Sequence, residues 1–278
     1  MNIQASLQSQ IQAALGIDPG IVDDNSASVE IARRIEFIKG VLLKSGLKAL
    51  VLGISGGVDS STAGRLCQLA INELKAEGHN VRFIAVRLPY KTQADEADAQ
   101  AALQFIQPDL VTTVNIAEAV DGMMAGIKIE GIDPSAELTD FVKGNVKARQ
   151  RMIAQYAVAG YTTGLVVGTD HAAEAVMGFF TKHGDGACDF APLSGLTKGQ
   201  VRLLAKQMGA PKHLVVKAPT ADLEDLDPGK LDEAAYGCTY EDIDNYLLGE
   251  DVSPVAAAII EAAYLKTAHK RELPVVPS

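Results

Sequence analysis

Residues 55–60, Ser-Gly-Gly-Val-Asp-Ser, combine the residue types and spacing that a phosphate-binding loop needs. They follow an apolar run at residues 49–54 and open a stretch with helical periodicity. Backbone N–H groups and the positive end of a helix dipole would therefore meet at one point. The two glycines allow a positive φ and close approach of an anion, and the serine hydroxyls add donors. The predicted phosphate site comprises Gly53, Ile54, Ser55, Gly56, Gly57, Val58, Asp59 and Ser60.

Asp59 brings a negative charge to this loop. It would repel a phosphate unless a divalent cation lay between them, so we predict Mg²⁺ at Asp59. The loop is not a Walker A motif, which has Gly and Lys where Val58 and Asp59 stand, and it lacks the Gly-x-Gly-x-x-Gly spacing. The alternative is a plain glycine-rich turn with an ordinary first-turn aspartate. The six residues together favour phosphate binding.

The composition restricts the class of protein. The chain has 278 residues, is 47% apolar and carries a formal charge of −10. An acidic chain suits a polyanion such as tRNA poorly, so no nucleic-acid partner is expected. Cys67, Cys188 and Cys238 are widely spaced, which favours a reducing compartment over a disulfide framework or a zinc site. No apolar run approaches the length of a membrane span, so we expect a cytoplasmic protein without a membrane partner.

Helical and extended patterns alternate along the chain. Helices are predicted over residues 3–15, 31–42, 60–77, 94–107 and, interrupted near Gly131 and Pro134, 117–159; strands are predicted over 49–54, 81–88, 110–116 and 165–168. This alternation predicts an α/β fold, namely a doubly wound, mostly parallel sheet with helices on both faces and ligands outside the carboxyl ends of the strands. We expect residues 1–278 to form one domain, with the helices of residues 1–48 packing on the α/β core.

The carboxy-terminal third contains clear helix boundaries. Thr197 and Gln200 fit a capping box, Thr239 opens a helix that ends at Gly249, and Ser253 precedes a proline that opens the last helix. Residues 217–238 are poor in apolar side chains, and a loop of that length predicts a functional lid. Residues 181–191 are a second candidate mobile loop.

Six sequence blocks resemble NAD synthetase, a family of the ATP pyrophosphatase (PP-loop) superfamily. They are residues 51–66, 83–96, 168–174 (Gly-Thr-Asp-His-Ala-Ala-Glu), 178–182 (Gly-Phe-Phe-Thr-Lys), 217–223 (Lys-Ala-Pro-Thr-Ala-Asp-Leu) and 264–271 (Tyr-Leu-Lys-Thr-Ala-His-Lys-Arg). The blocks span most of the chain, and the likeness is strongest to the bacterial ammonia-dependent type. The resemblance implies a Rossmann-like fold of the adenine nucleotide alpha hydrolase type.

The resemblance also implies a ligase that amidates nicotinic acid adenine dinucleotide (deamido-NAD). In this family ATP adenylates the substrate carboxylate with loss of pyrophosphate, and ammonia then displaces AMP to give NAD. The family pattern implies Asp59 and Glu174 as Mg²⁺ ligands, with Lys198 completing the catalytic set. It places Thr169, Lys198 and Thr220 on ATP. Alone, Lys198 would be an ordinary first-turn residue and Glu174 a surface residue.

The second substrate carries its own pyrophosphate and needs cations of its own. The resemblance implies a deamido-NAD site made of Arg149, Lys182, Asp189, His269 and Lys270. In relatives the dinucleotide lies at a dimer interface, so we expect a homodimer in which both chains contribute. The cations near His269 also suit a helix end, and the two interpretations are compatible. His79 and His213 are predicted to be surface residues, and His171 receives no role.

Two alternatives stay open. Ser-Gly-Gly-Val-Asp-Ser also occurs in GMP synthetases, so one alternative is another PP-loop enzyme that adenylates a purine oxygen. The other is a nucleotide-binding module without catalysis, although Asp59, Glu174 and Lys198 together count against it. Glutamine-dependent relatives carry an additional amidase domain with a nucleophilic cysteine. The synthetase blocks leave no room for one, so free ammonia is the expected nitrogen donor.

Overall fold

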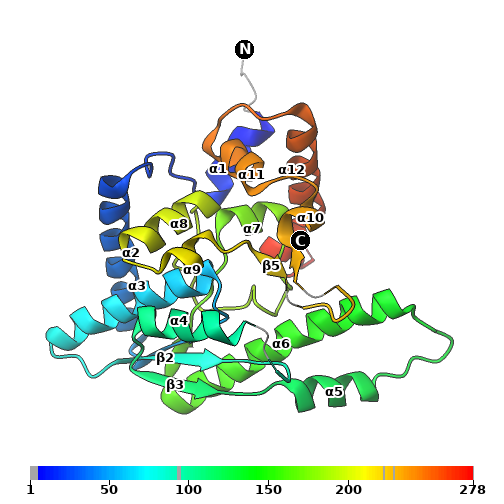
Figure 1. The fold of residues 1–278 in the computed structure, drawn as a ribbon, viewed down its shortest axis with the longest axis horizontal. Coiled ribbons are helices and arrows are strands. Elements are labelled where there is room, and N and C mark those ends of the chain that lie inside the picture. The colour runs from blue at the N-terminus through cyan, green and yellow to red at the C-terminus, as the bar shows by residue number, and fades with distance from the viewer. Residues whose placement is uncertain (1–5, 93–94, 222, 228, 278) are drawn as a thin grey trace.

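The computed structural model describes residues 6–92, 95–221, 223–227 and 229–277. Its centre is a four-stranded sheet in the order β3-β2-β1-β4 (Figure 1). The strands are β1 (Ala49–Gly53), β2 (Arg82–Arg87), β3 (Leu110–Thr113) and β4 (Gly164–Val166). All pairings are parallel, and Val51 of β1 lies opposite Ile84 of β2 and Val166 of β4. The predicted doubly wound parallel sheet is confirmed.

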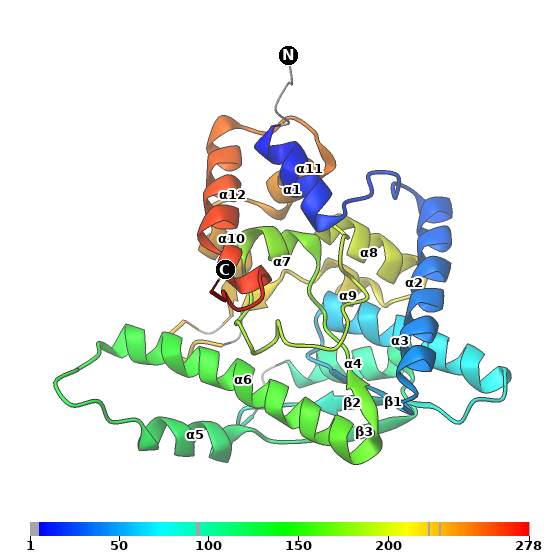
Figure 2. The same cartoon turned by 180° about the vertical axis from the view of Figure 1, so that it is seen from behind.

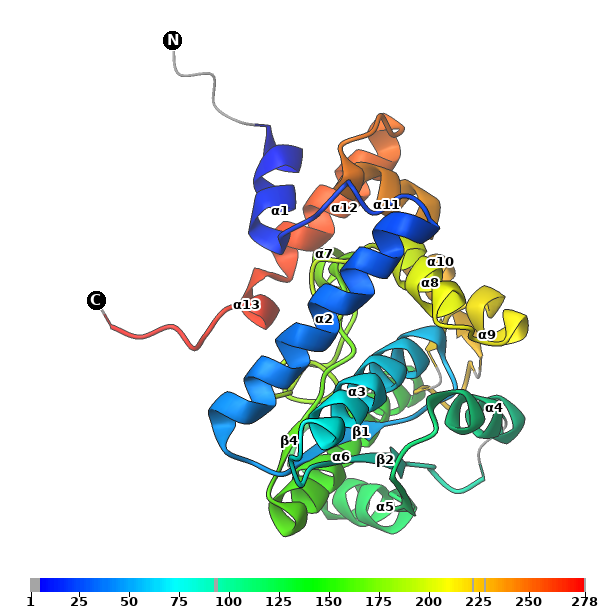
Figure 3. The ribbon, with the colours of Figure 1, turned by 90° about the vertical axis from the view of Figure 1, so that its left-hand side faces the viewer.

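The two faces of β1 bury different sets of helices because successive side chains alternate across a strand. Leu50 and Leu52 face a core that includes α2, α3, α4, α8 and α9, whereas Val51 faces a core that includes α5 and α6 (Figure 3). These helices are α2 (Asp24–Ser45), α3 (Val58–Ala76), α4 (Glu96–Ile106), α5 (Ala117–Gly126), α6 (Ala136–Thr162), α8 (Lys198–Gln207) and α9 (Lys212–Val216).

A helical core, separate from the α/β core on the two faces of the sheet, lies beyond the carboxyl edge of the sheet (Figure 2). It contains Ile11, Val176, Tyr246 and Ile260. The helices are α1 (Leu7–Leu15), α7 (Ala172–Met177), α10 (Asp232–Tyr236), α11 (Tyr240–Leu248) and α12 (Pro254–Lys266), with the short α13 (Ala268–Arg271) after them. Both amino-terminal helices were expected on the α/β core. In the structure α2 packs there, against α3 and α8, whereas α1 packs on α7 and α11.

The local signals in the sequence set most helix boundaries. Thr197 and Thr239 each form a capping box, and Ser253 caps α12, as predicted. The helical stretch over residues 117–159 breaks between α5 and α6, also as predicted. Residues 3–5 and 94, which belong to predicted helices, lie outside the described residues. Within the described residues, no helix has the length and apolar character that crossing a membrane requires.

The described part of residues 217–238 contains regular secondary structure. They contain the antiparallel pair β5 (Thr220–Ala221) and β6 (Lys230–Leu231), followed by α10. The sequence predicts a loop throughout, because a two-residue strand pair leaves no periodic pattern. We call the described residues from Lys217 to Leu231 the strap. Its conformation matters because it lies against the candidate site.

Candidate functional site

A cavity of about 880 Å³ opens at the carboxyl edge of the sheet. The carboxyl end of β1, the start of α3, the middle of α6 and the starts of α7 and α8 all contribute to its wall. The strap contributes Lys217, Thr220 and Leu223. Segments from both cores therefore meet around one space, where parallel sheets of this kind place their ligands.

The loop between β1 and α3 has the geometry of an anion cradle. Gly56 has a φ of +94°, which turns the chain sharply before the helix. Gly57 is the N-cap of α3 and provides no side-chain cap, so the amides of the first turn suit an anion. The hydroxyls of Ser55 and Ser60 lie 3.1 Å apart, and Ser55 Oγ accepts from Gly57 N at 3.2 Å.

The predicted ATP residues gather around this cavity. Its lining includes Gly53, Ile54, Ser55, Gly57, Val58, Asp59, Ser60, Thr169, Lys198 and Thr220. Gly56 belongs to the loop but is not among the residues that line the cavity. A Cβ added to Gly56 would be 2.7 Å from the backbone nitrogen of Ala99. Gly53 N donates to Gln155 Oε1 of α6 at 2.7 Å, so α6 fixes the end of β1.

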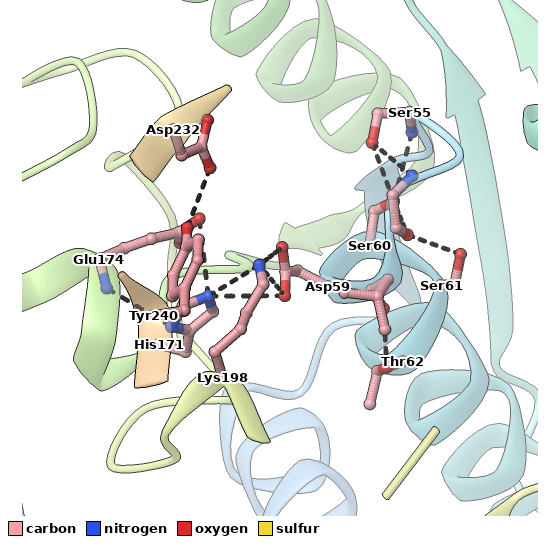
Figure 4. Close-up of polar contacts among 12 residues, drawn as sticks. Ser55, Asp59, Ser60, Ser61, Thr62, His171, Glu174, Lys198, Asp232 and Tyr240 are labelled. Atoms are coloured by element: carbon pink, nitrogen blue, oxygen red, sulfur yellow. Dashed lines mark hydrogen bonds and ion pairs between the residues drawn. The ribbon is translucent and has the colours of Figure 1, made fainter. Parts of the chain in front are cut away.

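Asp59, Glu174 and Lys198 line the cavity and form a charged cluster together with the fully buried His171 (Figure 4). Lys198 Nζ lies 3.0 Å and 2.8 Å from the two carboxylate oxygens of Asp59 and 3.3 Å from His171 Nε2. His171 Nε2 lies 3.5 Å from Asp59 Oδ1 and 3.6 Å from Glu174 Oε1. Three helix starts thus bring together residues that are far apart in sequence.

Lys198 is held from several directions. It is 1% exposed, and its backbone N–H donates to Asp244 Oδ1 at 3.0 Å. Its ammonium lies 5.0 Å from the centre of the Tyr240 ring. The Tyr240 hydroxyl in turn donates to Asp232 Oδ2 at 2.9 Å, at the start of α10. These contacts fix the position of the Lys198 ammonium in the protein without a ligand.

Burial and mutual charge shift the pKa values of this cluster. Burial, followed by the charge of Asp59, raises the pKa of Glu174 well above its ordinary value. Burial also opposes ionisation of Asp59 and Lys198, but their attraction lowers the pKa of Asp59 and raises that of Lys198. Burial and the Lys198 charge lower the pKa of His171 to about 3, so its imidazole is neutral at physiological pH.

The cluster fits a small divalent cation. Potential ligand atoms of Asp59, His171 and Glu174 all lie within 4.8 Å of one another. Burial, with the charges of Asp185 and Asp59, also raises the pKa of nearby Asp170 to about 7. The charge of Asp59 contributes to the raised pKa values of Glu174 and Asp170, and a bound cation would relieve this repulsion; Mg²⁺ prefers oxygen ligands such as these carboxylates. Asp59 and Glu174, the two predicted metal ligands, are therefore in suitable positions.

The predicted deamido-NAD residues lie beside the cavity. Arg149 of α6 donates to the carbonyl oxygen of Lys182 at 3.3 Å, and Lys182 Nζ donates to the carbonyl oxygen of His269 at 2.5 Å. Lys270 lines the cavity and donates to the carbonyl oxygens of Gly178 and Phe180, both at 2.8 Å. Arg149 and Lys182 lie far from His269 and Lys270 in the sequence, but the structure joins the two pairs within one chain.

Asp189 has a different environment from the other predicted dinucleotide residues. Its carboxylate accepts from the backbone N–H of Val166 at 2.6 Å, and its own backbone N–H donates to the carbonyl of Val166 at 2.9 Å. The residue is exposed. The structure therefore shows Asp189 bonded to β4, on the loop that carries Lys182. Its predicted role toward a dinucleotide stays a prediction.

The strap is anchored at its start and again at Asp225 and Leu226. Lys217 Nζ lies 2.9 Å from Asp95 Oδ2 and 2.6 Å from Asp98 Oδ2, near the start of α4. On α6, the Asp140 carboxylate accepts from the backbone N–H groups of Asp225 and Leu226, both at 2.8 Å. Lys147, another buried residue of α6, donates to the Asp225 carboxylate at 2.5 Å. The strap's predicted function as a lid stays a prediction.

Some residues of the site were missed from the sequence. His171, Gln155 and the strap anchors Asp140 and Lys147 were given no role. For His171 a local signal existed, because it stands three residues before Glu174, the N-cap spacing. The contacts of Gln155, Lys147 and Asp140 link residues more than 70 positions apart, and no local sequence pattern predicts them. His79 and His213 are exposed, as predicted.

Comparisons with known proteins agree with this arrangement. The family model for NAD synthase matches residues 30–274. The NH(3)-dependent NAD(+) synthetase of Pseudomonas putida strain GB-1 is 59% identical over 274 residues, covering 98% of this chain and 99% of the relative. The crystal structure of NAD+ synthetase from Burkholderia pseudomallei is 51% identical, with a TM-score of 0.82 over 96% of each chain.

A third similar protein is the NMN synthetase of Francisella tularensis. It is 32% identical, with a TM-score of 0.78 over 90% of this chain and 98% of that one. The family match extends from α2 to beyond α13 and so takes in the loop, the charged cluster and the cations beside the cavity. The chain belongs to the NAD synthase family.

Proposed function

We propose that this protein is an ammonia-dependent NAD synthetase. It forms a C–N bond by amidating deamido-NAD through an acyl-adenylate, and it splits ATP into AMP and pyrophosphate. The observation that carries the proposal is the convergence of the phosphate loop with Asp59, Glu174 and Lys198 around one cavity. The full-length likeness to NH(3)-dependent relatives supports the choice of reaction, and the family match counts against both alternatives.

The reaction must overcome the low reactivity of a carboxylate toward an amine. Adenylation removes the negative charge and provides AMP as a leaving group. In our proposal the residues of the loop bind the β- and γ-phosphates that leave as pyrophosphate, and the Lys198 ammonium stabilises the charge that develops there. Thr169 and Thr220, which also line the cavity, contact ATP in this proposal. Mg²⁺ bound by Asp59 and Glu174 would supply further neutralisation of the pyrophosphate.

We propose that deamido-NAD binds beside the cavity. Arg149, Lys182 and Lys270 supply positive charge near its pyrophosphate, and His269 and Asp189 complete the set. The nicotinate carboxylate would then reach into the cavity toward the α-phosphate of ATP. Since elements of both cores line the cavity, we propose that the chain works as a single synthetase domain.

The nitrogen donor is ammonia in our proposal. Use of glutamine would need an activated cysteine, and a reactive thiolate requires a lowered pKa. Burial instead raises the pKa of Cys188 and Cys238 to about 11 and raises that of Cys67 as well. The three free cysteines and the acidic composition also support a cytoplasmic location without a nucleic-acid partner.

A product assay tests the whole proposal. The purified chain, Mg-ATP, ammonium and deamido-NAD should give NAD, AMP and pyrophosphate in equal amounts, measured by chromatography. At fixed total ammonium the rate should rise with pH, because the fraction of free amine grows. Appearance of ADP and phosphate would contradict the proposal.

Two parallel reactions sharpen this assay. Glutamine in place of ammonium should give no NAD, and turnover with glutamine alone would overturn the ammonia assignment. Because the chain is similar to an NMN synthetase, nicotinic acid mononucleotide is the alternative substrate to compare with deamido-NAD. We expect deamido-NAD to be preferred, because the cations at Arg149 and Lys182 suit a dinucleotide pyrophosphate. Preference for the mononucleotide would contradict this part of the proposal.

We further propose a homodimer whose interface completes the dinucleotide site. Exposed apolar side chains follow one side of α6 on either side of Arg149: Leu138 is 51% exposed, Ile153 51% and Tyr156 36%. Large exposed apolar surfaces of this kind suit a protein partner. Arg149, Lys182 and His269 are already joined within one chain, so their separation in the sequence is no argument for a dimer. The apolar side of α6 is the observation that supports it.

Substitution of Arg149 tests this proposal. Arg149→Ala should weaken deamido-NAD binding about tenfold or more and change ATP binding little. The substitution removes the guanidinium and with it the charge-assisted hydrogen bonds to the pyrophosphate of deamido-NAD. Calorimetric titration with each ligand measures both effects. Lys206→Ala, which removes an exposed lysine of α8, is the control and should change neither affinity. Equal weakening of both ligands in Arg149→Ala, or light scattering from a fully active monomer, would contradict the proposal.

A further inference from the structure

An aromatic ring lies beside the Lys198 ammonium, and the proposed chemistry does not yet use it. Lys198 Nζ is 5.0 Å from the centre of the Tyr240 ring, within the roughly 6 Å over which a ring face attracts a cation. Both residues are buried, so little water screens the contact. Because the attraction between a cation and a ring is stronger when both are desolvated, Tyr240 contributes to the position of the ammonium.

Other aromatic side chains hold the Tyr240 ring in its orientation. The Tyr236 ring packs edge-on against it, with ring centres 5.5 Å apart and planes at 79°, and Phe179 packs edge-on against Tyr236 at 4.7 Å. The Tyr240 hydroxyl donates its one proton to Asp232 Oδ2 at 2.9 Å, so the Tyr236 hydroxyl, 3.0 Å away, donates to Tyr240. Contacts at the ring and at its hydroxyl therefore fix the same side chain.

The bond to Asp232 also connects the ring to the strap. Asp232 is the first residue of α10 and directly follows β6, the second strand of the strap. Its backbone N–H donates to the carbonyl oxygen of Pro219, near the start of the strap, at 3.2 Å. Figure 4 shows the bond from Tyr240 to Asp232 beside the contacts of Lys198. The docked strap thus contributes to the position of the ring.

The polar partners of Lys198 cannot hold it unchanged through the reaction. Its ammonium has three N–H groups and lies 3.0 Å and 2.8 Å from the oxygens of Asp59 and 3.3 Å from His171 Nε2. To donate to a phosphate, the ammonium must give up one of these contacts. Attraction to a ring face depends on the charge and its distance and uses no particular N–H group. The contact with Tyr240 can therefore persist while the other partners change.

We infer that Tyr240 is a positioning residue, whose ring holds the Lys198 ammonium at the phosphate loop while its N–H groups move from Asp59 to the leaving pyrophosphate. This inference rests on the proposed function only in taking Lys198 as the group that stabilises that pyrophosphate. The charge on the leaving group develops in the transition state. Loss of the ring should therefore lower the maximal rate more than it weakens ATP binding.

Two substitutions separate the ring from its hydroxyl. Tyr240→Leu removes the ring, and we expect pyrophosphate release at saturating ATP to slow about 10–30-fold, with the KM for ATP within about threefold of the parent value. Tyr240→Phe keeps the ring but leaves Asp232 without this donor, so it should retain at least about a third of the parent rate and melt at a lower temperature. Equal losses of rate in both variants, or a parent-like rate in Tyr240→Leu, overturn the inference.

A fluorinated series tests the charge of the ring with little change in packing. Mono-, di- and trifluorinated phenylalanine, introduced in place of Tyr240 by amber suppression, progressively withdraw electron density from the ring face. The rate should fall stepwise from that of Tyr240→Phe, while the melting temperature stays close to that of Tyr240→Phe. A rate that does not depend on fluorination overturns the inference, also where Tyr240→Leu does not fold. Failure of the proposed function would appear separately, as a parent protein that forms no NAD.

Discussion

Glu174→Gln and Asp59→Asn should each lower the rate of pyrophosphate release from ATP by about 10³-fold or more. Each change removes one carboxylate charge from the proposed cation site and leaves the side-chain volume nearly unchanged. Pyrophosphate cannot leave readily from a site that does not neutralise it. The measurement is pyrophosphate released with deamido-NAD present and ammonium absent, which isolates the adenylation step. A rate near that of the parent in either variant would rule out its role as a metal ligand.

Stability separates the two variants. The pKa of Glu174 is raised well above its ordinary value, so without a cation the carboxyl is already inclined to be neutral, and Glu174→Gln should not lower the free energy of unfolding. Asp59→Asn removes the partner of the buried Lys198 ammonium and should destabilise the protein by about 3 kcal/mol. Glu174→Gln is therefore the cleaner test of catalysis.

A double variant provides the control for Asp59→Asn. Adding Lys198→Met removes the unpaired charge, so the double variant should recover much of the lost stability. It should stay inactive, because both charged groups are missing. If the double variant were no more stable than Asp59→Asn alone, the ion pair between these side chains would not be the cause of the loss.

The second large effect is expected from Gly56→Ala. A left-handed φ costs a residue with a Cβ about 1–2 kcal/mol, and the new Cβ would be 2.7 Å from Ala99 N, so the backbone must also move. We expect a total loss of about 3 kcal/mol in the free energy of unfolding. ATP binding should weaken at least tenfold, because the amides of the loop move with Gly56.

The neighbouring glycine is the matched control. Gly57 has a φ of −79°, which alanine adopts freely, and an added Cβ would approach Ser55 Oγ no closer than 3.4 Å. Gly57→Ala should therefore change the free energy of unfolding by less than about 1 kcal/mol. Urea unfolding of the two variants measures the difference, and calorimetry with ATP measures binding to Gly56→Ala. Equal stability of the two variants would contradict this account of Gly56.

The sequence predicted the features that short segments determine by themselves. The phosphate loop depends on Gly56 and its neighbours, and the capping boxes depend on side chains three residues apart. The alternation of apolar strands and helices likewise limited the fold to a parallel sheet with helices on both faces. Each of these patterns reflects backbone conformation and burial within a few residues.

Contacts between distant segments could not be predicted in the same way. Lys198 pairs with Asp59 across 139 positions, and the pairing depends on how α8 packs on α3. The strap anchors on α6 depend on the docking of a segment with almost no periodic pattern. His171 is an intermediate case. Its N-cap position could be predicted from its spacing to Glu174, but the position of its Nε2 between two carboxylates depends on the tertiary structure.

One helix contacts three separate parts of the site. The 27 residues of α6, about 40 Å of helix, contact the end of β1 through Gln155, the dinucleotide cations through Arg149 and the strap through Asp140. A shift of α6 caused by one ligand would alter the sites of the others, and thermodynamics makes such coupling reciprocal. Whatever factor bound dinucleotide adds to the affinity for ATP, bound ATP must add to the affinity for the dinucleotide. Closing that cycle requires four binding constants, of which any three determine the fourth.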